Sequence, residues 1–543
     1  MKDEKIEMRN QKFNSELKQN DFYSHSIKKQ LTLRKQKIQE NLMSKRLPYI
    51  EGNKNSLEID FNKLNAPEDL KKNYKTILKT TYEVRQYLRQ LFGSDLNDKK
   101  LALFLLRNFI ILQIKELPKE KRKLSRNDID LLKGLCDLLF DQDIQVRYEV
   151  SWCLINISLF PKVEPKLYTE ENLNKILNFI LHCDDQLINN AISMLRNFST
   201  TDSNKLYFIK NGGLQKAFDI LDNDMTNLYL IKHITIFFQN LTNILGKMSK
   251  LINNLLLIIP YLKKFIKYFI TNPLEDENEY INILITLNNL TKFQVKEVFK
   301  ILISENFSKI ILDFFGMLKN IKVRKYTFDI IVNMLSFNES TTQSLLNENL
   351  VHVLKQLLLE FKFNHKDFLA EIIFSISNIA SGSIAQIELL ESEDLIIDIF
   401  EISKYYIEMY NQDENNHRSI MRECIFSLCN IMTGTHNNIR EKLVTFENGF
   451  IMKILGFGLK CFNFKYENVN FLSAIIYTIK FCIICSEIIM IEEDNYIKKY
   501  IIEAQIDEYL NKLLFGELTS EVDKRNIEII LDSLKDDEMV NNF

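Results

Sequence analysis

Glycine, proline, cysteine and tryptophan are all scarce in this sequence. Its 543 residues include 13 glycines, 7 prolines, 8 cysteines and a single tryptophan. So few turn-forming residues argue against a protein of many short strands, because tight turns depend on glycine and proline. Leucine, isoleucine, lysine, glutamate and asparagine dominate instead, and this composition favours an all-helical chain.

The residues of common catalytic and metal sites are not grouped. The eight cysteines lie in apolar helical patterns without paired spacing, so we expect free thiols in a reducing compartment. CIIC (482–485) has the spacing of a redox or metal site, but no second pair accompanies it. The seven histidines are scattered, and neither a nucleophile elbow nor a paired-carboxylate signature is present. We therefore predict no metal, no cofactor and no enzymatic activity.

Long uncharged apolar runs are also missing. Residues 1–20 lack the apolar core that a signal peptide needs. The most apolar late stretch, 475–491, is interrupted by Lys480 and Glu487, so we expect no membrane span. With 46% apolar and 26% charged residues, the chain has the composition of a folded protein.

Charge is distributed unevenly along the chain. The net charge is −2, but residues 1–50 carry +6 and the remaining residues carry −8. A basic arm before an acidic body indicates that the arm meets an acidic partner. We predict four parts, namely a basic arm (1–47), a polar linker (48–72), a repeat solenoid (73–515) and a C-terminal helix with an acidic tail (516–543).

Two kinds of segment recur along the chain. The first opens with an acidic or asparagine turn and continues as an apolar helix, and its copies are 171–180, 211–220, 305–314, 348–357, 393–402 and 447–456. The second carries an asparagine deep in an apolar helix, and its copies are marked by Asn156, Asn197, Asn240, Asn289, Asn333, Asn378 and Asn430. Successive asparagines are 41 to 52 residues apart, close to the period of about 40–47 residues in armadillo and HEAT repeats. The widest gap contains 404–418, which we expect to form a surface loop.

Stacked repeats of this kind bury a continuous core, because no single unit can bury its own apolar face. We therefore predict an extended concave groove that suits an elongated partner. Glu371, Phe374 and Asn378 lie at i, i+3 and i+7 on one helix face, and the same spacing recurs over 423–430. An asparagine amide can hold both polar groups of a peptide backbone, while an aromatic face and a glutamate suit a cationic side chain. The predicted ligand is an extended peptide rich in lysine and arginine.

A purely structural interpretation of these residues is the alternative. A phenylalanine on a helix usually lies in the core, and a mid-helix asparagine often makes a hydrogen bond between helices or at a helix end. The register of seven asparagines favours the peptide-binding interpretation. A structural ladder of asparagines between repeats is still open, and the two roles can coexist.

The motif Trp152-x-x-x-Asn156 leads to a family resemblance. It matches in full the Trp-x-x-x-Asn motif of importin alpha, the armadillo-repeat adaptor of nuclear import, which the chain resembles over essentially its whole length. Residues 367–387 resemble a characteristic segment of that family, with Phe374 at the tryptophan position, and 422–434 resemble the next repeat. The resemblance implies an all-α, right-handed superhelical armadillo solenoid of about ten repeats. It also implies that the peptide is bound by Trp152, Asn156, Asn197, Asp202, Asn240, Asn289, Asn333, Glu371, Phe374, Asn378, Glu423, Phe426 and Asn430.

The basic arm resembles the importin-beta-binding segment of the same family. The matching positions lie in QLTLRKQKIQENLMSKR (30–46), and the residues implied to contact importin beta are Lys28, Lys29, Leu33, Arg34, Lys35, Lys37, Lys45 and Arg46. A basic helix by itself is often a solvated or nucleic-acid-binding tail, but its place before an acidic solenoid favours the importin interpretation. Basic residues of the arm could also occupy the chain's own groove.

Several positions depart from the family pattern. The tryptophan positions after Trp152 hold Ser193 and Ile236, the arginine of the fifth repeat corresponds to Asp329, and Asp202 is one residue out of register. YSHS (23–26) replaces a run of arginines. We therefore expect a weakened N-terminal peptide site, a better preserved C-terminal site and weaker autoinhibition.

The resemblance implies a nuclear import adaptor that shuttles between cytoplasm and nucleus. Its partners would be cargo proteins with basic localisation signals, importin beta at the arm and an export receptor at the C-terminal repeats, with neither membrane nor direct nucleic-acid binding. One alternative is an armadillo scaffold in adhesion or cytoskeletal complexes, which would not need the basic helix over 27–46. A phosphatase-type regulatory solenoid is a second alternative, and it would not need the register of asparagines.

Overall fold

A computed structural model describes nine stretches of the chain, and all the regular structure in them is helical. The described residues are 89–116, 128–160, 167–243, 251–409, 414–447, 449–461, 469–489, 496–515 and 519–535. The predicted basic arm, including all its importin-beta-binding positions, and the predicted linker lie outside them. The all-α prediction is confirmed for the described residues.

The chain forms two compact units. The described part of the N-terminal unit covers residues up to 301 together with 317–326, and that of the C-terminal unit covers 302–316 and the residues from 327 on. The boundary passes through α17 (Lys296–Ser304), α18 (Phe307–Met317) and α19 (Ile321–Leu335).

The helices before the boundary are η2 (Gln90–Phe92), α5 (Leu96–Glu116), α6 (Asp128–Leu138), α7 (Ile144–Ile157), α9 (Glu170–His182), η4 (Asp185–Leu187), α10 (Ile188–Phe198), α11 (Asp202–Lys210), α12 (Gly213–Asn223), α13 (Leu228–Thr242), α14 (Ile252–Leu256), α15 (Ile258–Thr271), η6 (Glu277–Tyr280) and α16 (Ile281–Thr291). The helices after it are α20 (Glu339–Leu346), α21 (Leu350–Phe361), α22 (Lys366–Ala380), α23 (Ile384–Ser392), α24 (Leu395–Met409), α25 (Glu414–Gly434), α26 (Asn437–Thr445), α27 (Phe450–Cys461), α28 (Val469–Ile489), α29 (Tyr496–Glu503), α30 (Ile506–Leu514) and α31 (Glu521–Lys535).

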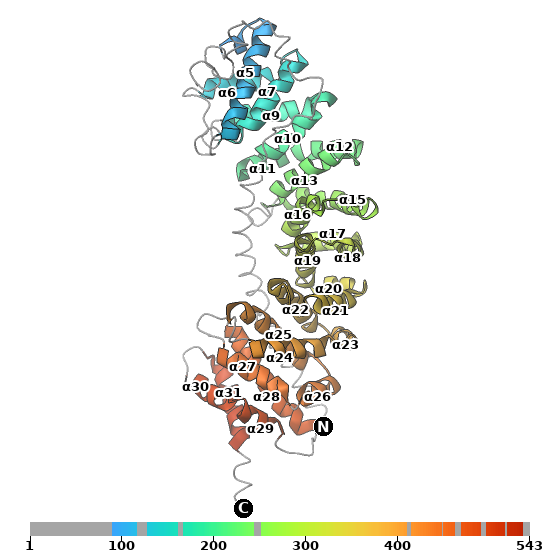
Figure 1. The fold of residues 1–543 in the computed structure, drawn as a ribbon, viewed down its shortest axis with the longest axis vertical. Coiled ribbons are helices and arrows are strands. Elements are labelled where there is room, and N and C mark those ends of the chain that lie inside the picture. Colours follow the sequence, from blue (N-terminus) through green and yellow to red (C-terminus); the bar gives the residue numbers. More distant parts are fainter. Residues whose placement is uncertain are drawn as a thin grey trace, which may run out of the picture. The chain divides into compact units, whose positions relative to one another are not determined.

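From α11 onward each repeat consists of three consecutive helices, such as α11, α12 and α13. We call the last member of each repeat its third helix, and include α5, α7 and α10 in that group. In the N-terminal unit α5 packs on α7, α7 on α10, α10 on α13 and α13 on α16. In the C-terminal unit α22 packs on α25, α25 on α28 and α28 on α31 (Figure 1). All seven asparagines that mark the repeat lie on third helices, from Asn156 on α7 to Asn430 on α25.

The other recurring segment lies where a second helix begins, and backbone geometry explains its composition. The residue between the first and second helix often has a positive φ, a conformation that glycine adopts freely and that asparagine and aspartate tolerate best among the others. These residues are Gly212 (92°), Asn306 (50°), Asn349 (65°), Asp394 (56°), Glu447 (43°) and Gln505 (56°). In five of the six copies, the acidic or asparagine turn seen in the sequence is therefore a left-handed turn between two helices; the exception is 171–180, where Thr169 before α9 has a φ of −66°.

One expectation about a loop is wrong. A surface loop is expected over 404–418, but α24 extends to Met409 and α25 begins at Glu414. Aromatic packing stabilises the end of α24, because the Tyr405 ring lies 4.7 Å from the Phe363 ring and Tyr406 is buried. Lys404 adds an ion pair of 2.8 Å to Glu447. The polar residues of this stretch suggested a loop, but the end of α24 packs through its aromatic residues.

Several cysteines are buried, and two glycines lie inside a packed helix. Cys136, Cys153, Cys183, Cys424 and Cys429 are free thiols, and burial raises the pKa of Cys136, Cys424 and Cys429 to about 12. Gly456 and Gly458 lie within α27, where a β-carbon on Gly456 would come within 3.0 Å of the Ala504 carbonyl oxygen. Among the described helices, none has the length and apolarity to cross a bilayer.

Candidate functional site

The repeated asparagines of the N-terminal unit hold each third helix to the one before it. The side-chain nitrogen of Asn197 lies 3.1 Å from the Ile155 carbonyl oxygen, and that of Asn240 lies 2.9 Å from the Arg196 carbonyl oxygen. Asn289 makes the same contact with Gln239, at 3.3 Å. Each accepting carbonyl lies in the last turn of its helix, where carbonyl groups lack the backbone N–H partners of the helix interior. The asparagines therefore cap the C-terminus of the preceding third helix.

The same device operates in the C-terminal unit. The Asn430 amide donates to the carbonyl and the hydroxyl oxygen of Ser377, both at 3.1 Å. The Asn378 amide donates to the hydroxyl of Ser336, just beyond the end of α19, at 3.0 Å. The structural ladder left open by the sequence is therefore present. It uses both amide hydrogens of Asn430 and one of Asn378, so a peptide-holding role would depend mainly on the amide oxygens.

Two further asparagines of the ladder are buried on their helices. Asn156 donates to the carbonyl of Trp152 on its own helix at 3.0 Å and is fully buried. Asn333 lies on α19 and is also buried.

The amide oxygens distinguish Asn197 and Asn289 from Asn378. Asn197 Oδ1 accepts from Arg196 Nε at 2.9 Å, and Asn289 Oδ1 accepts from Lys292 Nζ at 2.7 Å. Asn378 Oδ1 is buried, and no hydrogen-bond donor reaches it within the described part of the chain. A buried acceptor without a partner costs about 1–3 kcal/mol. Asn378 is therefore a ladder position at which an added N–H group would relieve such a cost.

We call an acid, an aromatic ring and an asparagine at i, i+3 and i+7 of one helix a column, as in Glu371, Phe374 and Asn378. The N-terminal unit contains a third column, which sequence reasoning missed. Glu149 precedes Trp152 and Asn156 at the same i, i+3 and i+7 spacing, and it is fully buried. Its carboxylate lies 2.8 Å from Nη1 of Arg107 on α5. The repeated spacing was the available signal for Glu149, but the sequence held no signal for Arg107.

In the C-terminal unit the two predicted columns lie on α22 and α25, which pack together. Phe374 is 8% exposed, and Glu371 is partly exposed. Phe426 is half-buried, with its ring 4.7 Å from that of Phe471. These helices bring the two acids, two rings and two amides of the predicted site onto neighbouring elements.

Glu423 is the most deeply buried acid of this pair of columns. It is 3% exposed, and its Oε1 accepts from Arg422 Nη2 at 2.9 Å. Burial raises the pKa of Glu423 above its usual range, and the neighbouring Arg422 opposes that shift. Ionisation of Glu423 in the folded state therefore lowers the folding stability.

The N-terminal unit differs at the positions where tryptophans were expected. Ser193 makes a hydrogen bond with the Tyr229 hydroxyl at 3.2 Å, and Ile236 is buried. Arg196 Nη1 lies 2.9 Å from Nδ1 of His233. Burial and the charge of Arg196 lower the pKa of His233 to about 3, so the imidazole is neutral at physiological pH. A buried cation of the chain itself, Arg196, therefore lies beside Ser193 and Asn197 on α10.

Asp202 begins α11, where it forms an ion pair of 3.0 Å with Lys205. Its carboxylate already faces a lysine of the chain itself. No group of three or more potential metal ligands is found among the residues that the structure describes.

Comparisons with known proteins identify the fold. No family model matches the chain, and no curated protein matches it. Among solved structures it resembles an engineered protein, with a TM-score of 0.61 and 14% identity over 83% of this chain and 98% of that one. It also resembles a chain from a structure of the phosphorylation switch between cadherin and beta-catenin, with a TM-score of 0.53 and 11% identity over 86% of this chain and 96% of that one. At these identities the likeness concerns the fold alone, and the chain is an all-α repeat solenoid.

Proposed function

We propose that this protein is a nuclear import adaptor that binds basic localisation signals on the third helices of its C-terminal unit. The observation that carries the proposal is the repeated column of acid, aromatic ring and asparagine on α22 and α25. Glutamates would pair with lysine or arginine heads, and Phe374 and Phe426 would contact their alkyl stems. Binding, and no enzymatic reaction, is the proposed activity.

The basic arm would supply the second half of the adaptor function. Its resemblance to the importin-beta-binding segment and its charge of +6 within residues 1–50 support binding to importin beta. When importin beta is removed, the arm would compete for the peptide surface and release the cargo. Shuttling between cytoplasm and nucleus, with export through a receptor at the C-terminal repeats, completes the proposal.

An armadillo scaffold in cell adhesion is the rival function. The likeness to a chain from the cadherin and beta-catenin structure favours it, although the low identity carries only the fold. A scaffold of that kind would not need a basic helix over 27–46. Binding to importin beta therefore discriminates between the two functions.

A fluorescence titration with a lysine-rich and arginine-rich peptide tests cargo binding. We expect the chain to bind the peptide, more tightly when residues 27–46 are deleted, and more weakly as salt is raised because salt screens charges. A peptide with each basic residue replaced by glutamine is the control. No binding at low salt by either form of the chain would remove the adaptor proposal.

The same deletion tests the arm. Importin beta should be retained by the full chain in a pull-down and lost when 27–46 are removed, because these residues hold the proposed contacts. Circular dichroism of both forms controls for folding. Unchanged retention after the deletion would overturn the assignment of the arm.

A further inference from the structure

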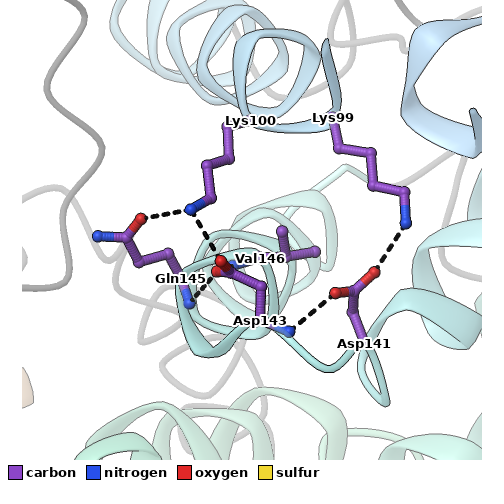
Figure 2. Close-up of polar contacts among 6 residues, drawn as sticks. All are labelled: Lys99, Lys100, Asp141, Asp143, Gln145 and Val146. Carbon is purple, nitrogen blue, oxygen red and sulfur yellow. Dashed lines mark hydrogen bonds and ion pairs between the residues drawn. The ribbon is translucent and has the colours of Figure 1, made fainter. Parts of the chain in front are cut away.

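The α5–α7 pair is held in register by a polar cluster at one end. Lys99 on α5 lies 2.9 Å from Asp141, and Lys100 lies 2.8 Å from both Asp143 and Gln145 (Figure 2). Asp143 also caps α7, because its carboxylate accepts from the backbone nitrogens of Gln145 and Val146. The start of α7 is thus tied to α5, and this sets which residues meet two turns further along.

Arg107 is the α5 residue that meets the column of Glu149 and Trp152. Its guanidinium carbon lies 5.9 Å from the centroid of the Trp152 ring and 5.8 Å from that of the Phe104 ring. Its Nη1 donates to Glu149 Oε1 at 2.8 Å. One guanidinium therefore lies against two aromatic rings and pairs with a buried carboxylate.

These are the contacts that the peptide-binding chemistry assigns to a cargo arginine, since aromatic faces attract guanidinium groups and carboxylates pair with them. We propose that Trp152, Phe104 and Glu149 form an arginine site that the chain fills with its own Arg107. The ligand class of the site is a guanidinium side chain, and Arg107 excludes external arginines from it. The inference takes this ligand class from the proposed function, but the site itself follows from the contacts of Arg107.

The fit of Arg107 is incomplete. Its Nε is buried and finds no hydrogen-bond acceptor among the described residues, and only one of its nitrogens bonds to Glu149 at 2.8 Å. An arginine and a carboxylate that pair through two parallel hydrogen bonds bind more strongly. An external guanidinium is not constrained by the backbone of α5, so it can take that geometry once Arg107 is removed.

The single tryptophan of the chain makes the site directly observable. Because Trp152 is the only tryptophan, the intrinsic tryptophan fluorescence of the full-length protein comes from this site alone. We would titrate N-acetyl-argininamide into the wild type and into Arg107→Ala, following this fluorescence and Tm. Half-saturation should occur at a concentration at least about tenfold lower for the variant, because the cation–π and carboxylate contacts are vacant. The ligand should also raise the lowered Tm of the variant.

Controls separate the site from general charge effects. Arg147 lies on α7 with Glu149 and Trp152, but its ion-pair partner is Asp184. Arg147→Ala should therefore respond to the arginine compound as the wild type does. N-acetyl-lysinamide at equal ionic strength should act more weakly than the arginine compound, because it lacks the planar fork. Adding Glu149→Gln to Arg107→Ala should abolish the preference for the arginine compound.

If Arg107→Ala does not fold, Arg107→Gln keeps a hydrogen-bond donor towards Glu149 and vacates the space over the rings, and the same shift is expected. Equal responses of wild type and Arg107 variants to the arginine compound would overturn the proposal. This test is independent of cargo binding. A chain that fails to bind basic peptides can still show rescue at Trp152, and a chain that binds them can show none.

Discussion

Replacing Asn378 with alanine is expected to weaken the binding of a basic peptide by about tenfold, which corresponds to one hydrogen bond to a buried acceptor. The reason lies in the amide oxygen. Asn378 Oδ1 is buried and lacks a donor among the described residues, so a peptide N–H group would satisfy it. Asn197 Oδ1 already accepts from Arg196, and Asn197→Ala should change affinity by less than about twofold.

The two variants should also differ in folding stability. Both remove an asparagine that caps the preceding third helix or binds just beyond its end, through Ile155 for Asn197 and Ser336 for Asn378. Asn197→Ala should therefore lose about 1–3 kcal/mol of unfolding free energy. Asn378→Ala should lose less, because it also removes a buried oxygen that has no donor among the described residues. A larger loss of affinity in Asn378→Ala, the less destabilised of the two variants, identifies the oxygen of Asn378 as a ligand contact.

The measurement is a titration of labelled peptide, paired with urea denaturation of each variant. Asn240→Ala gives a second N-terminal comparison, since its amide caps the Arg196 carbonyl. The reverse ranking, with Asn197 or Asn240 as the sensitive position, would place the peptide on the N-terminal unit. It would contradict the expectation that the C-terminal site is the better preserved.

The repeat was predictable from sequence because its signals are local. An asparagine recurring about every 40–50 residues marks the third helices, and the turn before most second helices reflects a left-handed backbone that few residue types tolerate. Residues at i, i+3 and i+7 lie on one helix face, so each column was also predictable. The same spacing could have predicted that Glu149 shares a helix face with Trp152 and Asn156.

Contacts between helices were not predictable in the same way. Arg107 and Glu149 are 42 residues apart, and their pairing depends on how α5 lies on α7. The destination of each asparagine amide depends on where the previous third helix ends, as for Asn430 and Ser377. Periodicity predicted that these amides share a face with a ring and an acid. It could not show that their nitrogens are already committed to neighbouring repeats.

Changing Glu423 to glutamine is expected to have opposite effects on stability and on binding. Burial raises the pKa of Glu423 in the folded state, with Arg422 opposing the shift. The folded protein therefore binds the proton more strongly than the unfolded chain, and stability falls as pH rises through the range above the ordinary glutamate pKa of 4.5. Glutamine removes this loss while its oxygen can still accept from Arg422. We expect Glu423→Gln to be more stable than the wild type at neutral pH, with the difference vanishing below about pH 4.5.

Peptide affinity should move the other way. A buried carboxylate attracts a nearby cation more strongly than a neutral amide does, so the variant should bind a basic peptide several-fold to about tenfold more weakly at neutral pH. Glu401→Gln is the control on α24 of the same unit. Lys362 lowers the pKa of the Glu401 carboxyl, so that variant should be slightly less stable at neutral pH and should bind the peptide as the wild type does.

Chemical denaturation between pH 4 and pH 8, combined with peptide titration, measures both effects. A stabilised Glu423→Gln variant with unchanged affinity would show that the carboxylate charge is not used for binding, and a destabilised one would show that its ion pair with Arg422 outweighs the effect of burial.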